Sequence, residues 1–142
     1  MKAAVTKKLV LDASVALAWC FPGESTEFSE RVLDQLANGF AAFVPAIWPF
    51  EVANALLVGE RRKRVTVAQV TSLLQRLSDL PITVEPIGVG GAFGPILAVA
   101  RREQLTEYDA AYLELALREA HPLATLDEGL RRACRSAGVG LV

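Results

Sequence analysis

Hydrophobic residues along this 142-residue chain occur in short continuous runs that alternate with longer stretches of helical period. Short runs rich in Val, Ile, Leu and Ala, bounded by turn residues, are typical of buried strands. These runs predict four strands and a last short one, at residues 9–13, 41–45, 82–87, 122–126 and 139–142.

The segments between these runs carry apolar residues at intervals of three and four, which predicts amphipathic helices. In the first of them Phe28, Val32 and Leu36 share one face, and Asn38 with Gly39 ends the helix. Capping signals at Thr66 and a cluster of cations at 61–64 bound two others. The predicted helices lie at residues 28–37, 49–60, 66–77, 90–102, 106–120 and 127–137.

Strands that alternate with helices predict a parallel sheet covered by helices on both faces. We therefore expect the α/β class, as a single-domain three-layer α/β/α sandwich with a mostly parallel central sheet and right-handed crossovers. The expected domain spans residues 1–142. Hydrophobic residues make up 52% of the chain, which is enough for one substantial core.

Composition and charge narrow the possible functions. The formal net charge is −1, so any binding to nucleic acid depends on a local basic patch. Two distant cysteines, Cys20 and Cys134, are expected to be buried and reduced, as suits the cytoplasm. The single histidine, His121, is expected in a turn and excludes a histidine-rich zinc site. Asp12 interrupts the first apolar stretch, so we expect a soluble cytoplasmic protein without a membrane span.

Two aspartates stand directly after predicted strands. Asp12 ends the first strand, and Asp127 follows the fourth in the segment LATLDEG. In open parallel sheets, ligands bind beyond the carboxyl ends of the strands, so both carboxylates are expected to face one crevice. The structural alternative is that each caps the helix that follows, because Asp is a favoured N-cap residue.

Two further acids lie on predicted helices. Glu51 shares a helix face with Asn54 among small apolar residues, although a first-turn glutamate also favours the helix dipole. Asp109 lies about 200° around its helix from Glu107, which we assign to the solvent face, so Asp109 is expected to point inward. Thr106 and Asp109 also fit a loose capping-box pattern, which is the structural alternative for Asp109.

Four carboxylates at one crevice, with no lysine or histidine beside them in these segments, repel one another. Their pKa values rise unless a cation neutralises them. Carboxylate oxygens, helped by hydroxyls or waters, suit a hard divalent ion such as Mg²⁺ or Mn²⁺. Because such a site leaves room for phosphate oxygens and an attacking water, the sequence predicts a metal-dependent phosphodiester hydrolase.

In this order, the segments LVLDASVALAW, PAIWPFEVANAL, LTEYDAAYLELA and LATLDEGLRRA resemble the PIN-domain family, specifically its VapC-like toxin ribonucleases. The resemblance implies a Mg²⁺- or Mn²⁺-dependent endoribonuclease that forms a homodimer. It also implies inhibition by a cognate antitoxin whose C-terminal segment lies across the active-site groove. By position, the implied catalytic and metal-binding carboxylates are Asp12, Glu51, Asp109 and Asp127, and the implied supporting residues are Ser14, Asn54 and Thr125.

Other readings are open for parts of the chain. The alternative function is a catalytically inactive PIN-like module that binds RNA or protein, although the intact set of four acids favours an enzyme. The basic clusters at 61–64, 101–102 and 131–135 either solvate helix ends or contact RNA phosphates or an acidic antitoxin segment. The helices of residues 50–80 belong either to the core or to an antitoxin or dimer surface. Four aromatic residues are expected in the core or an interface rather than as base-stacking platforms: Trp19, Phe21, Trp48 and Phe50.

Overall fold

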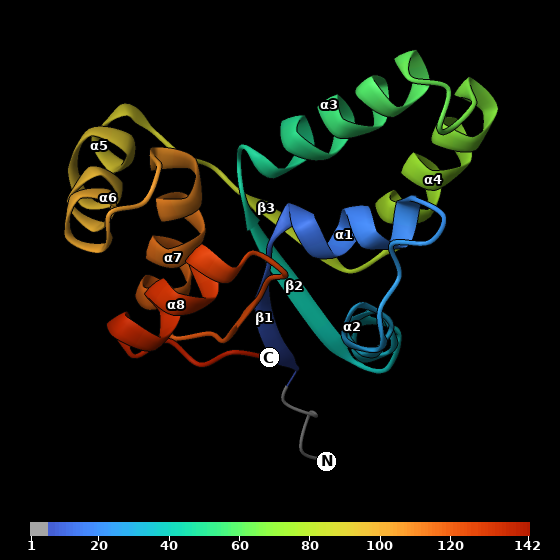
Figure 1. Cartoon of the computed structure of the whole chain (residues 1–142). Coiled ribbons are helices and arrows are strands. Elements are labelled where there is room, and N and C mark those ends of the chain that lie inside the picture. The colour runs from blue at the N-terminus through green and yellow to red at the C-terminus, as the bar shows by residue number, and fades with distance from the viewer. Residues whose placement is uncertain (1–5) are drawn as a thin grey trace.

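The computed structural model describes residues 6–142, so the first five residues of the expected domain lie outside it. Four parallel strands form one sheet in the order β3-β2-β1-β4. Figure 1 labels β1, β2 and β3 of this sheet. The predicted strand at 139–142 is reduced to one bridge, in which Leu141 pairs with Leu123. The strands are β1 (Lys7–Leu11), β2 (Phe40–Pro45), β3 (Ile82–Glu85) and β4 (Leu123–Ala124).

Helices cover both faces of this sheet, which confirms the predicted three-layer α/β/α architecture. In Figure 1 the labelled helices α1, α2, α3 and α4 lie to one side of the strands, and α5, α6, α7 and α8 lie to the other. No helix within residues 6–142 combines the length and the apolar character needed to cross a membrane. The helices are α1 (Ala13–Cys20), α2 (Glu27–Ala37), α3 (Trp48–Arg61), α4 (Val67–Asp79), α5 (Val89–Gly91), the π-helical segment η1 (Ala92–Ile96), α6 (Leu97–Glu103), α7 (Glu107–Glu119) and α8 (Glu128–Ala137).

Local chemistry explains where several helices begin or change. The predicted capping box is present at α4, where the Thr66 side chain accepts from the Gln69 amide at 3.1 Å and Gln69 Oε1 accepts from the Thr66 amide. The predicted helix at 90–102 is divided into α5, η1 and α6. Pro95 lies inside η1, and because proline has no backbone N–H, it removes one hydrogen bond of the helix at this place.

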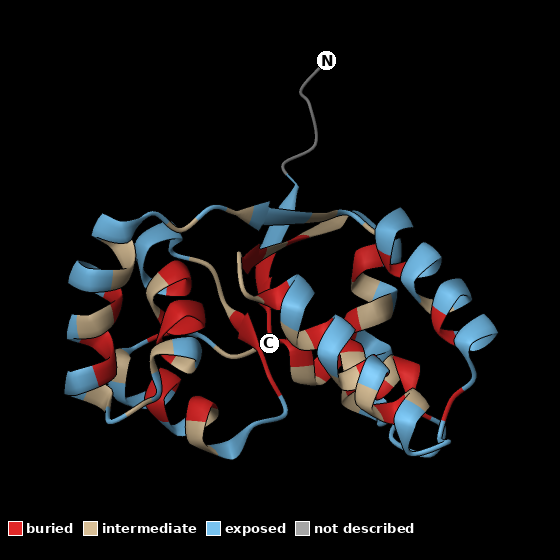
Figure 2. Ribbon diagram, turned by 90° about the horizontal axis from the view of Figure 1, so that it is seen from above, coloured by how far each residue is buried: buried red, intermediate tan, exposed pale blue. Residues whose placement is uncertain are grey.

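The core is centred on β1, whose neighbours on both sides are strands. Leu9, Val10 and Leu11 are fully buried, since helices cover both faces of this strand (Figure 2). Cys20 and Cys134 are buried free thiols, as predicted. Burial removes apolar area from water and stabilises the fold by about 25 cal/mol per Å².

Close packing joins α3 to the segment after α1. Phe21 lies against Gly59 of α3, where a Cβ atom would stand 2.7 Å from the Phe21 ring. Phe21 and Trp48 are buried and Trp19 is partly buried, which confirms the expectation that they pack rather than bind bases. Phe50 does not pack into the core of this chain, because 77% of it is exposed.

Candidate active site

Three of the four predicted carboxylates follow the carboxyl ends of three adjacent strands. Asp12 comes directly after β1 and Glu51 lies in the first turn of α3, beyond β2. Asp127 ends the loop after β4. Strands β1 and β4 are parallel and in register, and the Asp12 amide donates to the Ala124 carbonyl at 3.0 Å. Parallel pairing therefore brings these acids, which are far apart in the sequence, to one edge of the sheet.

Asp12 is a buried carboxylate held by two hydroxyl groups. Only 6% of Asp12 is exposed. Ser14 Oγ donates to Asp12 Oδ2 at 2.6 Å, and Thr125 Oγ1 donates to the same oxygen at 2.7 Å. The two predicted supporting residues therefore contact the carboxylate directly. Asp12 occupies the N-cap position of α1, but its side chain makes no capping hydrogen bond.

Both hydroxyl groups also accept a hydrogen bond from a backbone amide of the loop after β4. The Leu126 amide donates to Ser14 Oγ at 3.0 Å, and the Asp127 amide donates to Thr125 Oγ1 at 3.0 Å. Each hydroxyl has one proton and an ionised carboxylate has none, so each hydroxyl donates to Asp12 while its oxygen accepts from an amide. Oδ2 thus accepts from two hydroxyl groups. A backbone hydrogen bond from Ala13 also lowers the pKa of the Asp12 carboxyl group.

Asp127 caps its own helix, as the structural alternative proposed. Its Oδ2 accepts from the Leu130 amide at 2.8 Å, while the residue as a whole is exposed. Arg131 of α8 also contacts this loop, since its Nη1 donates to the Thr125 carbonyl at 3.1 Å. Sequence analysis placed Arg131 only in a basic cluster, because no local pattern shows that its side chain turns back to the loop.

Glu51 has a partner that sequence analysis did not identify. The hydroxyl of Tyr112, on α7, donates to Glu51 Oε1 at 2.6 Å. Asn54 was expected to steady this glutamate, and the structure corrects that expectation: Asn54 is exposed and makes no hydrogen bond to Glu51. The amide side chain lies almost one turn along α3, whereas the phenol reaches Glu51 from the facing helix.

Asp109 lies in the first turn of α7. Its amide donates to Thr106 Oγ1 at 3.1 Å, so Thr106 caps the helix, but no return bond from the Asp109 side chain completes a capping box. Its carboxylate is half-buried, as expected for an inward position. Glu107 was assigned to the solvent face, and this was wrong: it is half-buried, and its Oε1 is buried without a hydrogen-bond partner in a pocket beside Phe50.

The electrostatics of the site connect all four acids. Burial raises the pKa of Asp12, and the charge of Asp127 raises it further, against the lowering effect of the two hydroxyl donors. Burial is also the main cause of the raised pKa of Glu51, with contributions from Asp12 and Asp109. The pKa of Asp109 is raised by burial and then by Asp127 and Asp12. The four carboxylates are therefore within mutual electrostatic range.

No Lys, Arg or His of residues 6–142 forms an ion pair with any of these four acids. The ion pairs within residues 6–142 involve other acids: Glu24, Glu103, Glu114, Glu119 and Glu128. In that same range, no three Asp, Glu, His or Cys side chains lie close enough together to form a complete ion-binding cluster. The donor set is all oxygen, which suits a hard divalent ion, but the carboxylates are not assembled into a closed cage.

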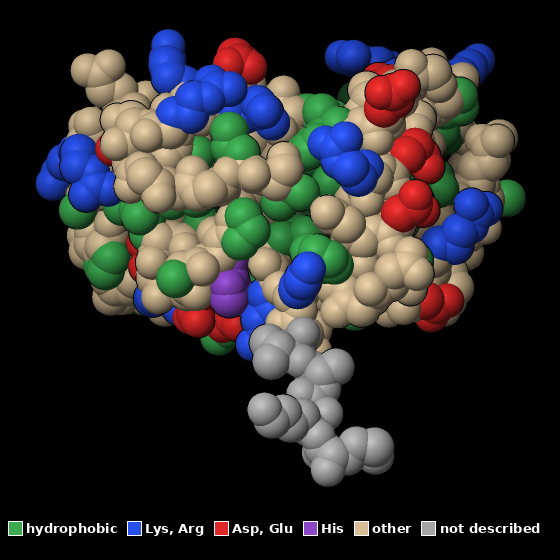
Figure 3. Space-filling model, turned by 90° about the horizontal axis from the view of Figure 1, so that it is seen from below, with side chains coloured by type: hydrophobic (Ala, Val, Ile, Leu, Met, Phe, Trp, Pro, Cys, Tyr) green, Lys and Arg blue, Asp and Glu red, His purple; other side chains and the backbone are tan. Residues whose placement is uncertain are grey.

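Other candidate features lie away from this edge. His121 precedes β4, whereas Thr125 and Asp127 follow it, so the histidine is at the opposite end of the strand. On the face shown in Figure 3, lysine and arginine side chains form separate groups rather than one continuous basic surface. Within the cluster at 61–64, Arg64 pairs with Glu24 at 2.9 Å and stacks over Phe21.

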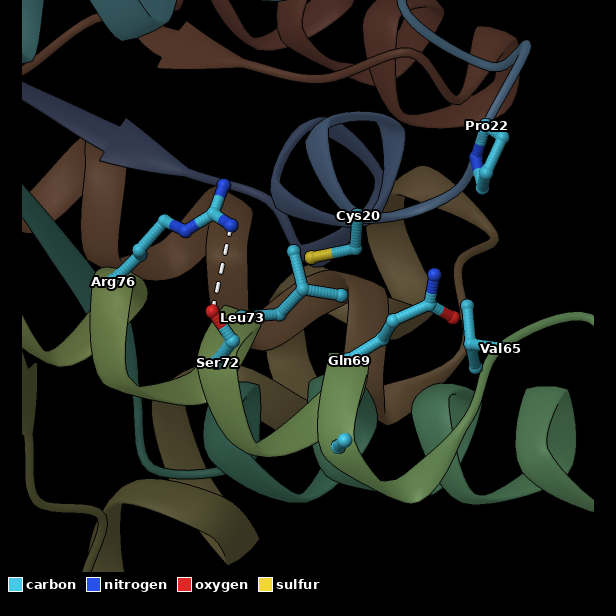
Figure 4. Close-up of a pocket in the computed structure, with 8 residues that line it drawn as sticks. Cys20, Pro22, Val65, Gln69, Ser72, Leu73 and Arg76 are labelled. Carbon is cyan, nitrogen blue, oxygen red and sulfur yellow. Dashed lines mark hydrogen bonds between the residues drawn. The ribbon is translucent and has the colours of Figure 1, made fainter.

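A pocket of about 360 Å³ lies between α1 and α4, where Cys20 faces Leu73 and Arg76 (Figure 4). Arg76 donates to Ser72 on its own helix. None of the seven predicted site residues lines this pocket. The pocket is thus a surface feature of the first group of helices, separate from the acidic edge of the sheet.

Comparisons with known proteins give one consistent result. The family model of the PIN domain matches residues 9–136. Ribonuclease VapC3 of Pyrobaculum aerophilum is 31% identical over 123 residues, which cover 87% of this chain and 92% of that protein. The structure of VapBC2 from Rickettsia felis, bound to a promoter DNA fragment, superposes with a TM-score of 0.66 at 14% identity, covering 95% of this chain and 97% of that one. A toxin–antitoxin complex from Klebsiella pneumoniae gives a TM-score of 0.59 at 16% identity, with coverage of 84% and 86%.

Proposed function

Because this chain belongs to the PIN-domain family, we propose that it is a metal-dependent endoribonuclease and the toxin of a toxin–antitoxin pair. The observation that carries the proposal is the electrostatic coupling of Asp12, Glu51, Asp109 and Asp127, which come from four separate elements and have no ion-pair partner within residues 6–142. A ribonuclease name for the relative from Pyrobaculum aerophilum supports RNA as the substrate.

The donor set fits Mg²⁺ or Mn²⁺. Magnesium usually keeps several of its waters and binds through one or two carboxylates together with substrate phosphates, so a closed cage of protein ligands is not required. We propose that Asp12, Asp109 and Asp127 hold the ion, with Glu51 acting directly or through water. When bound, the ion supplies the positive charge that activates water and stabilises the phosphate in the transition state.

Hydrogen bonds from neighbouring residues orient the carboxylates of Asp12 and Asp127. Ser14 and Thr125 both restrain Asp12 through Oδ2. Asp127 likewise uses Oδ2 to cap α8. Since His121 lies at the other end of β4, the described site contains no imidazole to act as general base.

The test is cleavage of a panel of labelled RNAs with Mn²⁺, with EDTA as the control and Asp109→Asn as the inactive variant. We expect cleavage by the natural protein with Mn²⁺ only, and none by the variant. An inactive RNA- or protein-binding module is the second candidate. RNA retention without Mn²⁺-dependent cleavage would favour that module and reject the nuclease.

We also propose that a cognate antitoxin binds this protein, since two structural neighbours are the VapBC2 assembly and a toxin–antitoxin complex. Addition of the purified antitoxin is expected to abolish RNA cleavage. A cytoplasmic location follows from the proposed substrate, and the two buried free thiols agree with a reducing compartment.

A homodimer completes the proposal, with the exposed apolar surface at the start of α3 and α7 as its candidate interface. Phe50 is 77% exposed and Tyr108 is 64% exposed, and both line a pocket with Ile87. Phe50→Asp is expected to shift the mass measured by light scattering from dimer to monomer. Val67, an apolar residue of α4 that is 68% exposed, provides the matched control in Val67→Asp, which is expected to leave the dimer intact.

A further inference from the structure

Tyr112 forms the only side-chain link between α3 and α7 at the site among the hydrogen bonds of residues 6–142. The residue is fully buried. Its hydroxyl donates to Glu51 Oε1 at 2.6 Å, across 61 positions of sequence. A bond of this length to a carboxylate is in the range of charge-assisted hydrogen bonds, which are stronger than neutral ones.

Tyr112 and Asp109 are three residues apart on α7, so they lie on the same face of that helix. This helix packs against β1 and β2, whose carboxyl ends lead to Asp12 and to α3. One helix therefore contributes both an acid of the site and the donor that restrains a second acid. The positions of Asp109 and Glu51 are fixed relative to each other through a single rigid element.

The ring of Tyr112 is immobilised by the core, whereas Glu51 is half-buried and has three side-chain torsions. A glutamate without a partner samples several rotamers, and ordering it on ion binding costs conformational entropy. A fixed donor on Oε1 removes most of that freedom before the ion arrives. Oε2 has no side-chain donor within the described residues.

We infer that Tyr112 is a positioning residue, which holds the Glu51 carboxylate in place for the divalent ion. This role depends on the nuclease function proposed above. A purely structural role is the competing explanation, because a buried phenol also needs an acceptor. The two explanations differ in whether loss of the hydroxyl changes the affinity for the ion itself.

Calorimetry with Mn²⁺ alone distinguishes them. Loss of a group that orients a metal ligand typically weakens metal binding by 10–100-fold, so we expect Tyr112→Phe to raise the Kd for Mn²⁺ by about tenfold. Tyr108 offers a matched control, since it is on the same helix and is 64% exposed. Tyr108→Phe removes the same hydroxyl group and is expected to leave the Kd unchanged. Equal Kd values for the natural protein and Tyr112→Phe would overturn the inference.

A second measurement needs no change at Tyr112. The chain contains two tyrosines, so ¹³C labelling at Cζ gives two resonances, which Tyr108→Phe assigns. Addition of Mg²⁺ is expected to shift the Tyr112 resonance and not that of Tyr108, and Glu51→Ala is expected to remove the shift. If the protein binds Mg²⁺ but the Tyr112 resonance does not shift, the positioning role is rejected. If the natural protein binds neither Mg²⁺ nor Mn²⁺, the proposed function is rejected instead.

Discussion

Thr125→Val tests the hydroxyl network that supports Asp12. Valine has nearly the same shape as threonine, so the change removes the hydroxyl from a fully buried position without opening a cavity. Three hydrogen bonds are lost: one to Asp12 Oδ2, one from the Asp127 amide, and a longer one of 3.4 Å with Ser14 Oγ. A bond to a charged group contributes about 1.5–3 kcal/mol, and the loss of the part-buried bond from the Asp127 amide adds to this cost. We expect a loss of about 2–3 kcal/mol of unfolding free energy at neutral pH.

The loss is expected to depend on pH. Burial raises the pKa of Asp12 above its ordinary value, so ionising this group costs folding stability as the pH rises from the unfolded-state pKa through the folded-state pKa. The Thr125 bond lowers that pKa, and its removal therefore raises it further. The deficit of Thr125→Val should be largest where Asp12 is ionised. At acidic pH, where Asp12 is protonated, it should fall to about 1 kcal/mol, the contribution of a neutral hydrogen bond.

Urea unfolding followed by tryptophan fluorescence, in steps from about pH 8 down to about pH 4, measures this difference. Thr125→Ser is the matched control, because it keeps the hydroxyl and loses one methyl group. Its cost is expected to be about 1 kcal/mol at every pH. If valine and serine gave equal, pH-independent losses, the assigned bond to Asp12 would not contribute and the reasoning would be refuted.

Three further predictions concern charge, packing and thiol reactivity. Asp109→Asn should lower RNA cleavage to the level measured with EDTA. It should also slightly raise the unfolding free energy at neutral pH, because it removes a carboxylate whose pKa is raised by burial and by the neighbouring acids. A less stable variant would contradict the proposed repulsion between these carboxylates. Gly59→Ala should cost about 1–3 kcal/mol in urea unfolding despite the better helix propensity of alanine, because its Cβ would meet the Phe21 ring at 2.7 Å. Cys20 and Cys134 should react with a thiol reagent only after unfolding, because both are buried and burial raises the pKa of Cys134 to about 11. Rapid labelling of the native protein would disprove the expected protection of the thiols.

Local pattern was sufficient for α2, α3, α4, α7 and α8, for the order of the strands in sequence and for the choice of candidate acids. It did not predict α1 (Ala13–Cys20), and it predicted one helix at 90–102 where the structure has three elements. The spacing of apolar residues and the capping residues depend only on neighbours in the sequence, so the start of α4 at Thr66 could be predicted from the sequence. The weakest predictions were those that depend on a distant partner. The last predicted strand is only a bridge at Leu141, because its extent depends on the length of β4 beside it.

The acidic site illustrates the same division. The sequence alone predicted Asp12, Glu51, Asp109 and Asp127 as the acids of one site, since carboxylates within apolar segments need an explanation. Only the tertiary structure decided how each acid is held. Tyr112 reaches Glu51 from another helix, whereas Asn54, favoured by its spacing, does not contact it. Spacing along one helix determines on which side of the helix a side chain projects. Hydrogen bonds between different elements depend instead on how those elements pack.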